Sequence, residues 1–283
     1  MIKRNWTLIV LLILLPAILL SGCGKESSKK VKLIDISLTD EEYAFGVDKS
    51  QPGLIASVNE FIEKIQSDGS LDTIFDKYFG EGSPEPVLSA VPDSSKDQLV
   101  VATNASFEPF EYMIGDQYAG IDMEVAKLLA EYLDKELVIS NMDFDAVCLS
   151  VGQGKADIAM AGLTVTEARK EFVEFSSSYY NASQKLIVMA DDESFDSCKT
   201  AEEAEAVLAG LGAGVKIGVQ TGTTGQFYLE GDEDWGFDGF PVTCVGYNSG
   251  SLAVQDMING NIRYVIIDEG PALFITASTN ELN

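Results

Sequence analysis

The chain has 283 residues, of which 46% are hydrophobic, so it can bury a sizeable core in one or two domains. It carries 19 Lys and Arg against 45 Asp and Glu, and this acidic balance disfavours nucleic acid, whose binding depends on basic patches. Histidine is absent from the sequence, which excludes histidine-dependent triads and most zinc sites. We therefore expect no metal and no cofactor.

Residues 1–22 have the pattern of an export signal. A basic pair precedes the apolar stretch WTLIVLLILLPAILL, which is shorter than a membrane span requires and contains a proline. The Leu-Ser-Gly-Cys sequence that follows resembles a bacterial lipobox, a signal in which the chain is cut before the cysteine and the cysteine is lipidated. The resemblance implies a lipidated Cys23 followed by a polar tether over residues 23–30. An uncleaved anchor helix is the alternative.

The next segment predicts a strand, VKLIDI (residues 31–36), and then two helices. Apolar residues recur at helical spacing over residues 54–65, and the stretch LDTIFDKYF (residues 71–79) predicts a second, short helix. Residues 81–97 are rich in proline, serine and acidic residues, which is typical of a linker.

From residue 98 onward, strand and helix patterns alternate. Short strands rich in Val and Ile (QLVVAT, ELVIS, DIAMA, QKLIVMA, VKIGV, VTCVGY and RYVII) are separated by stretches of helical length. This alternation predicts α/β sheets with helices on both faces. Cys148 is expected to be a small buried side chain, and a Cys198–Cys244 disulfide is a further alternative.

Four stretches at predicted strand ends carry the chemistry: TNASFEPFEY, AGLTVTEARKEFVEFSSSYY, VQTGTTGQF and IIDEGPA. Open α/β sheets bind ligands on this side, and helix starts there present free N–H groups to a carboxylate. Arg169 suits the same carboxylate, Asp268 suits an ammonium group, and Phe107 offers an apolar wall. Together these groups describe a receptor for an α-amino acid.

Each group also has a purely structural interpretation. Thr223 is suited to cap a helix, Arg169 lies in a run of charges typical of a solvated helix face, and Asp268 is suited to the start of a helix, where acidic residues are favoured. Phe107 and Phe110 would most often belong to the core. The occurrence of all of them in one chain favours the binding site.

This set of motifs resembles the bacterial extracellular solute-binding proteins for polar amino acids, which have the two-lobed α/β type II periplasmic-binding fold. The resemblance implies that LTVTEAR binds the ligand carboxylate and that GTT and the strand-end acid complete the site. It also implies that Phe107 stacks over the ligand. This sequence departs from the family at Asn104 and Ala161, and Gln220 occupies a further pocket position, so the resemblance implies an amino acid but not which side chain it carries. The implied ligand-binding residues are Asn104, Phe107, Phe144, Ala161, Gly162, Leu163, Thr164, Arg169, Gln220, Thr223, Thr224 and Asp268.

The order of segments differs from the family. Residues 35–80 resemble the family's C-terminal end yet come first, which predicts a circular permutation. Residues 31–40 are then a strand of lobe 2 and a crossover, residues 41–80 and 98–188 form lobe 1, and residues 189–283 form the rest of lobe 2. The remnant of a tandem duplication is the alternative.

The resemblance implies a monomeric, lipid-anchored, extracytoplasmic protein that captures an amino acid and delivers it to the permease of an ABC importer. Closure of the lobes about two crossover strands, near Leu38–Thr39 and Met189–Ala190, would present the loaded form. The alternatives are a dehydratase-like enzyme and a ligand-sensing module on the same fold.

Overall fold

The computed structural model describes residues 30–80, 82–233 and 236–281. The predicted export signal, Cys23 and the predicted tether up to residue 29 lie outside the described residues. Within the described ranges, no helix combines the length and the apolar character that crossing a membrane requires.

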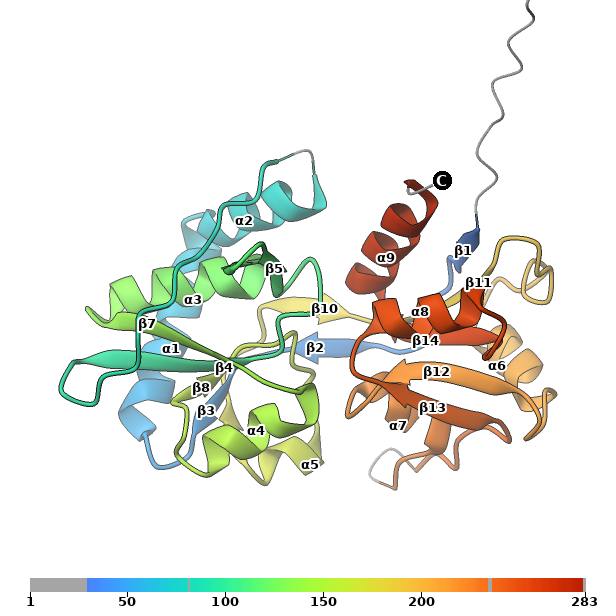
Figure 1. Cartoon of the computed structure of the whole chain (residues 1–283). Coiled ribbons are helices and arrows are strands. Elements are labelled where there is room, and N and C mark those ends of the chain that lie inside the picture. The colour runs from blue at the N-terminus through green and yellow to red at the C-terminus, as the bar shows by residue number, and fades with distance from the viewer. Residues whose placement is uncertain (1–29, 81, 234–235, 282–283) are drawn as a thin grey trace, which may run out of the picture.

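Two five-stranded sheets form two lobes, which a two-stranded ribbon joins (Figure 1). In lobe 1 the strand order is β7-β4-β8-β3-β9. Its strands are β3 (Gly46–Asp48), β4 (Gln98–Thr103), β7 (Glu136–Asn141), β8 (Ile158–Ala159) and β9 (Val173–Phe175), with a hairpin of β5 (Tyr112–Ile114) and β6 (Gln117–Ala119).

Helices cover both faces of the lobe 1 sheet. Successive strand residues point to opposite sides, and here the residues on both sides are apolar. Val101 belongs to the core cluster under the first three helices, and the adjacent Ala102 belongs to the cluster under α4. The helices of this lobe are α1 (Pro52–Ser67), α2 (Ser70–Phe79), α3 (Ile121–Tyr132), α4 (Phe144–Gly152) and α5 (Glu167–Lys170).

Lobe 2 has the same layered construction, with strand order β1-β11-β14-β12-β13. Helices α8 and α9 cover one face, over Ile187 and Val265, while α6 and α7 cover the other, over Leu186 and Ile266. The elements are β1 (Val31–Ile34), β11 (Gln184–Met189), β12 (Lys216–Gln220), β13 (Thr243–Tyr247), β14 (Tyr264–Asp268), α6 (Ala201–Ala209), α7 (Thr224–Glu230), α8 (Gly250–Ile258) and α9 (Glu269–Glu281).

The antiparallel ribbon of β2 (Glu41–Tyr43) and β10 (Tyr180–Ala182) connects the lobes. The predicted lobe boundary at residues 188 and 189, and the crossover at Met189–Ala190, are therefore wrong by one strand. β11 pairs with β1 and β14, so it belongs to lobe 2, and the second crossover lies at Ser183. The apolar run of β11 is equally suited to either sheet, so its composition does not reveal which lobe it joins.

The N-terminal block, which is residues 31–80, is divided between the two lobes. β1 pairs with β11, and the Asn280 side chain in α9 accepts a hydrogen bond from the Lys30 amide (2.8 Å) and donates one to the Val31 carbonyl (3.0 Å). β3 lies inside the lobe 1 sheet, between β8 and β9, and α1 and α2 share the core cluster of that lobe. These positions are the ones that a circular permutation requires, and the permutation itself stays a prediction.

Two smaller predictions concern the linker and the cysteines. The linker runs along lobe 1 rather than away from it, because Val87 is buried and exchanges backbone hydrogen bonds with Tyr118. Cys148 is buried, as expected. Cys198 and Cys244 are both free thiols, so the alternative of a disulfide between them is wrong.

Candidate functional site

The predicted ligand-binding side chains of both lobes meet at the face between them. Asn104 follows β4, Thr164 and Arg169 follow β8, Gln220 ends β12, and Asp268 ends β14. All five are at most 8% exposed. Because the strands end at this face, residues up to 164 positions apart in the sequence share one buried region. The solvated interpretation of Arg169 is therefore wrong.

Arg169 lies in the one-turn helix α5, whose N-cap Thr166 accepts a hydrogen bond from the Arg169 amide (3.2 Å). Its guanidinium donates to the carbonyl of Thr164 in lobe 1 (2.7 Å) and to the carbonyl of Gly222 in lobe 2 (3.1 Å), and it lies 5.1 Å from the centre of the Phe144 ring. Burial lowers the pKa of Arg169. A guanidinium remains charged under these conditions and provides the cation of the site.

Asp268 provides an anion from the other lobe, at the end of β14. It accepts a hydrogen bond from the Tyr43 hydroxyl (2.6 Å) in the ribbon. Burial and the nearby charge of Glu41 raise the pKa of Asp268 to about 7. The carboxylate is therefore poised to ionise fully when a cation enters the site.

Glu41, at the start of β2, lies between the lobes and is 5% exposed. Its carboxylate accepts hydrogen bonds from Thr164 of lobe 1 (2.7 Å) and Thr224 of lobe 2 (2.8 Å). Thr39 (2.6 Å) and Gln184 (3.1 Å) donate to its other oxygen. The two threonine hydroxyls predicted to bind the ligand therefore bind an internal carboxylate.

Asn104 and Gln220 form a second bridge between the lobes. The Asn104 amide donates to the Met142 carbonyl (2.7 Å), and this bond fixes its oxygen as the acceptor from Gln220 Nε2 (2.9 Å). Gln220 Oε1 is buried and has no hydrogen-bond partner among the described residues. An unpaired acceptor of this kind suits an N–H donor from outside the protein.

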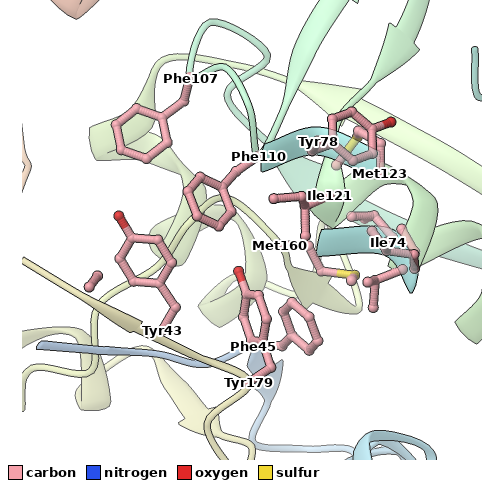
Figure 2. Packing of buried hydrophobic residues seen from close by; sticks show 14 of the residues in the cluster. Tyr43, Phe45, Ile74, Tyr78, Phe107, Phe110, Ile121, Met123, Met160 and Tyr179 are labelled. Atoms are coloured by element: carbon pink, nitrogen blue, oxygen red, sulfur yellow. The ribbon is translucent and has the colours of Figure 1, made fainter. Parts of the chain in front are cut away.

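Phe107 and Phe110 come from the loop after β4 and face Tyr43 of the ribbon (Figure 2). The Tyr43 and Phe110 rings meet edge to face at 5.1 Å. Gly162 has φ +52°, and a Cβ there would approach the Phe107 ring to 2.8 Å, so the close contact requires glycine. The Gly162 amide donates to Asp122 (2.9 Å), which leaves only its carbonyl for a ligand.

The remaining predicted residues have structural partners. The side chains of Ala161 and Leu163 belong to the core cluster below α4. Thr223 holds the N-cap position of α7, but its hydroxyl donates to the Gln220 carbonyl (2.7 Å). Phe144 and Arg169 line a pocket of roughly 260 Å³ between the lobes, together with Cys148, Leu163, Gly222 and Phe227.

The sequence analysis missed the ribbon residues Glu41 and Tyr43. They lie two positions apart on β2, so both point to the same face, toward the region between the lobes. The available signal was the stretch DEEYAFG, in which an acidic residue stands two positions before a tyrosine. On a strand the two side chains share one face, and a tyrosine on that face indicates that the face is not fully solvated.

Comparison with known proteins identifies relatives with the same architecture. The sequence model of one family, described as bacterial extracellular solute-binding proteins, family 3, matches residues 99–268. The arginine-binding extracellular protein ArtP of Bacillus subtilis (strain 168) is 35% identical over 126 residues, which cover 44% of this chain and 46% of that protein. The putative ABC transporter arginine-binding protein 2 of Escherichia coli (strain K12) is 31% identical over 178 residues.

The chain thus spans 46% and 65% of the lengths of these two relatives. Among solved structures, holo ArgBP from T. maritima aligns with a TM-score of 0.53 and 31% identity, over 64% of this chain and 74% of that one. The ancestral amino acid-binding protein AncCDT-1, described as a precursor of cyclohexadienyl dehydratase, aligns with a TM-score of 0.54 and 27% identity, over the same shares. The two-lobed α/β fold of type II periplasmic-binding proteins is therefore established.

Proposed function

Since the chain belongs to family 3 of the bacterial extracellular solute-binding proteins, we propose that it captures a free L-amino acid between its two lobes. The observation that carries this proposal is the burial of Arg169 and Asp268, which have opposite charge and come from opposite lobes, in one interlobe site. A zwitterion supplies a carboxylate for the first and an ammonium for the second, so neither charge stays buried without a partner.

The side chain of the amino acid ends in an N–H donor, and arginine is the proposed ligand. No group in the described part of the chain donates to the buried Gln220 Oε1, which favours a guanidinium, an amide or an ammonium and disfavours a carboxylate. The relatives named above as arginine-binding support the same choice. Asn104 and Gln220 are uncharged, so hydrogen bonding rather than ion pairing selects the side chain of the ligand.

Calorimetry against the twenty amino acids tests the proposal, after co-purified ligand has been removed by partial unfolding and refolding. We expect saturable binding of arginine and weaker binding of glutamine, with none of glutamate. Binding of glutamate in preference to arginine would refute the side-chain assignment, and a silent titration with all twenty would refute amino-acid capture.

We further propose that the protein acts outside the cytoplasm, held by a lipid on Cys23, and delivers its ligand to an ABC importer without catalysing a reaction. The lipobox-like sequence supports the anchor, and the description of one relative as an ABC transporter binding protein supports the delivery. Cys23→Ser should release the protein into the aqueous fraction with unchanged ligand affinity. Persistent membrane association of this variant would indicate an uncleaved anchor helix.

A further inference from the structure

The hydroxyl protons of Thr164 and Thr224 are already committed inside the protein. Both hydroxyls donate to the same oxygen of Glu41, at 2.7 Å and 2.8 Å. A threonine hydroxyl has one proton and two lone pairs, so a hydroxyl that donates to Glu41 can offer a ligand only a lone pair. These two side chains therefore accept from a ligand and do not donate to its carboxylate.

The Glu41 carboxylate is held in place by four hydrogen-bond donors that come from both lobes and from the chain that leads into the ribbon. Thr164 belongs to lobe 1 and Thr224 to lobe 2, while Thr39 lies on the connection that leads into β2 and Gln184 begins β11. Four donors satisfy one carboxylate, and among the described residues no Lys or Arg forms an ion pair with it. Hydrogen bonds rather than a direct ion pair fix its position.

Asp268 lies on the same side of the site. Gln184, which donates to Glu41, pairs with Asp268 across β11 and β14, and the Tyr43 hydroxyl from the strand of Glu41 donates to Asp268. The region next to Thr164 and Thr224 thus combines two carboxylates with hydroxyl lone pairs. The guanidinium of Arg169, which donates to the carbonyls of Thr164 and Gly222, supplies the positive charge of the site, so groups of both charges are available to a zwitterion.

We propose that Glu41 is a specificity-determining residue for the ammonium end of the ligand. By taking the protons of Thr164 and Thr224 it turns both hydroxyls into acceptors, and its charge, with that of Asp268, makes the region next to them a receptor for an α-ammonium group. The inference rests on the proposed capture of an amino acid. It adds that the site discriminates against acids without the amino group through Glu41 as well as through Asp268.

The test compares L-arginine with 5-guanidinopentanoate, which lacks only the α-amino group. In Glu41→Gln the shape is kept and the charge is lost. The amide has one acceptor oxygen where the carboxylate has two, so it cannot accept from the two threonine hydroxyls and from Thr39 and Gln184 at once. We expect the ratio of the two affinities to fall at least tenfold relative to the unmodified protein. Glu41→Asp, which keeps the charge, should retain most of the ratio, and Glu42→Gln, on the exposed side of the same strand, should leave it unchanged.

A role of Glu41 in stability alone would weaken both ligands equally, and an unchanged ratio in a folded Glu41→Gln variant would overturn the inference while leaving amino-acid capture intact. Thr224→Val provides a second measurement if that variant does not fold. Loss of the hydroxyl should lower the ratio, Thr224→Ser should retain it, and a Val variant with the original ratio would also overturn the inference. Failure of the unmodified protein to bind arginine would instead overturn the proposed function together with the inference.

Discussion

At the scale of residues, the groups proposed to bind the ligand each have a hydrogen-bond partner from another element. Arg169 contacts the Gly222 carbonyl of lobe 2, Asp268 contacts Tyr43, and Gln220 contacts Asn104. A ligand must therefore replace or share these hydrogen bonds, and its net binding energy is the difference between the two sets.

Replacing Arg169 tests the carboxylate end of the site. Arg169→Ala should weaken arginine binding by roughly 2–5 kcal/mol, because the buried ligand carboxylate loses its charged partner. Calorimetry measures the change, and Lys170→Ala, an exposed neighbour on α5, is the matched control. An affinity within threefold of the unmodified protein would show that Arg169 does not bind the carboxylate.

The raised pKa of Asp268 predicts a dependence of affinity on pH. Below about pH 7 the ligand-free carboxyl group is largely protonated and must release its proton to bind an ammonium group, so affinity should rise from pH 5.5 to pH 8. Between pH 5.5 and pH 8, across the pKa of about 7, ionisation of this one group should raise the affinity about thirtyfold. Titrations in buffers of different ionisation enthalpy should detect the released proton below pH 7.

The raised pKa of Asp268 also predicts how the stability of the ligand-free protein depends on pH. The folded, ligand-free protein binds this proton more tightly than the unfolded chain, so the contribution to stability is complete below about pH 4 and declines as the pH rises through 7. Asp268→Asn should remove this component of both profiles. Burial also raises the pKa of Asp122 to about 7, and a profile unaltered in Asp268→Asn would assign the titration to Asp122.

At the scale of elements, the loop after β4 in lobe 1 lies against the start of α9 in lobe 2. A Cβ at Gly270 would come within 2.9 Å of the Phe110 ring, which is fully buried among other aromatic side chains and has little room to move. The absence of a side chain at Gly270 therefore permits this close contact between the two lobes, and we expect it to be needed for the proposed closure around a ligand.

Gly270→Ala should oppose closure more than it opposes folding. Overpacking of this kind costs roughly 1–3 kcal/mol, which corresponds to a loss of affinity of about five- to hundredfold, while the melting temperature without ligand should change little. Gly53→Ala, in α1 with open space around the added Cβ, is the control. If Gly270→Ala lowers the melting temperature but leaves affinity unchanged, the contact belongs to the folding core rather than to closure.

Local patterns predicted the regular elements well and the boundaries between lobes less well. The helical spacing over residues 54–65 corresponds to α1, and QLVVAT corresponds to β4, because each pattern reflects burial of its own element. The strand β11 was assigned to the wrong lobe, because an apolar run does not state which sheet it will join. The donation of the Gly162 amide to Asp122 and the position of Glu41 depend on tertiary contacts that spacing alone does not encode.

At the scale of the whole molecule, the N-terminal block completes both lobes. β1 forms the edge of the lobe 2 sheet, β3 lies within the lobe 1 sheet, and α1 and α2 bury apolar side chains against lobe 1. Each such side chain contributes about 1.5–3 kcal/mol when it is fully buried. Neither lobe would keep its core without this block.

The predicted circular permutation can be tested by moving the block. A variant with residues 31–80 transferred to follow residue 283 should fold, melt cooperatively and bind arginine with unchanged affinity. The reason is that the Asn280 side chain, near the new junction, already donates a hydrogen bond to the Val31 carbonyl. Deleting residues 31–80 should abolish folding or binding. A deletion variant that melts cooperatively and binds normally would show that the block is dispensable and that the permutation is wrong.

The proposed function requires the interlobe site to recognise both charged ends of an α-amino acid, one by Arg169 and the other by Asp268. Calorimetry of the unmodified protein with L-arginine, agmatine, which lacks the carboxylate, and 5-guanidinopentanoate, which lacks the ammonium, tests it most directly. We predict saturable binding of arginine and a loss of at least a hundredfold, about 2.7 kcal/mol, for each analogue. Binding of either analogue as tightly as arginine would contradict the account.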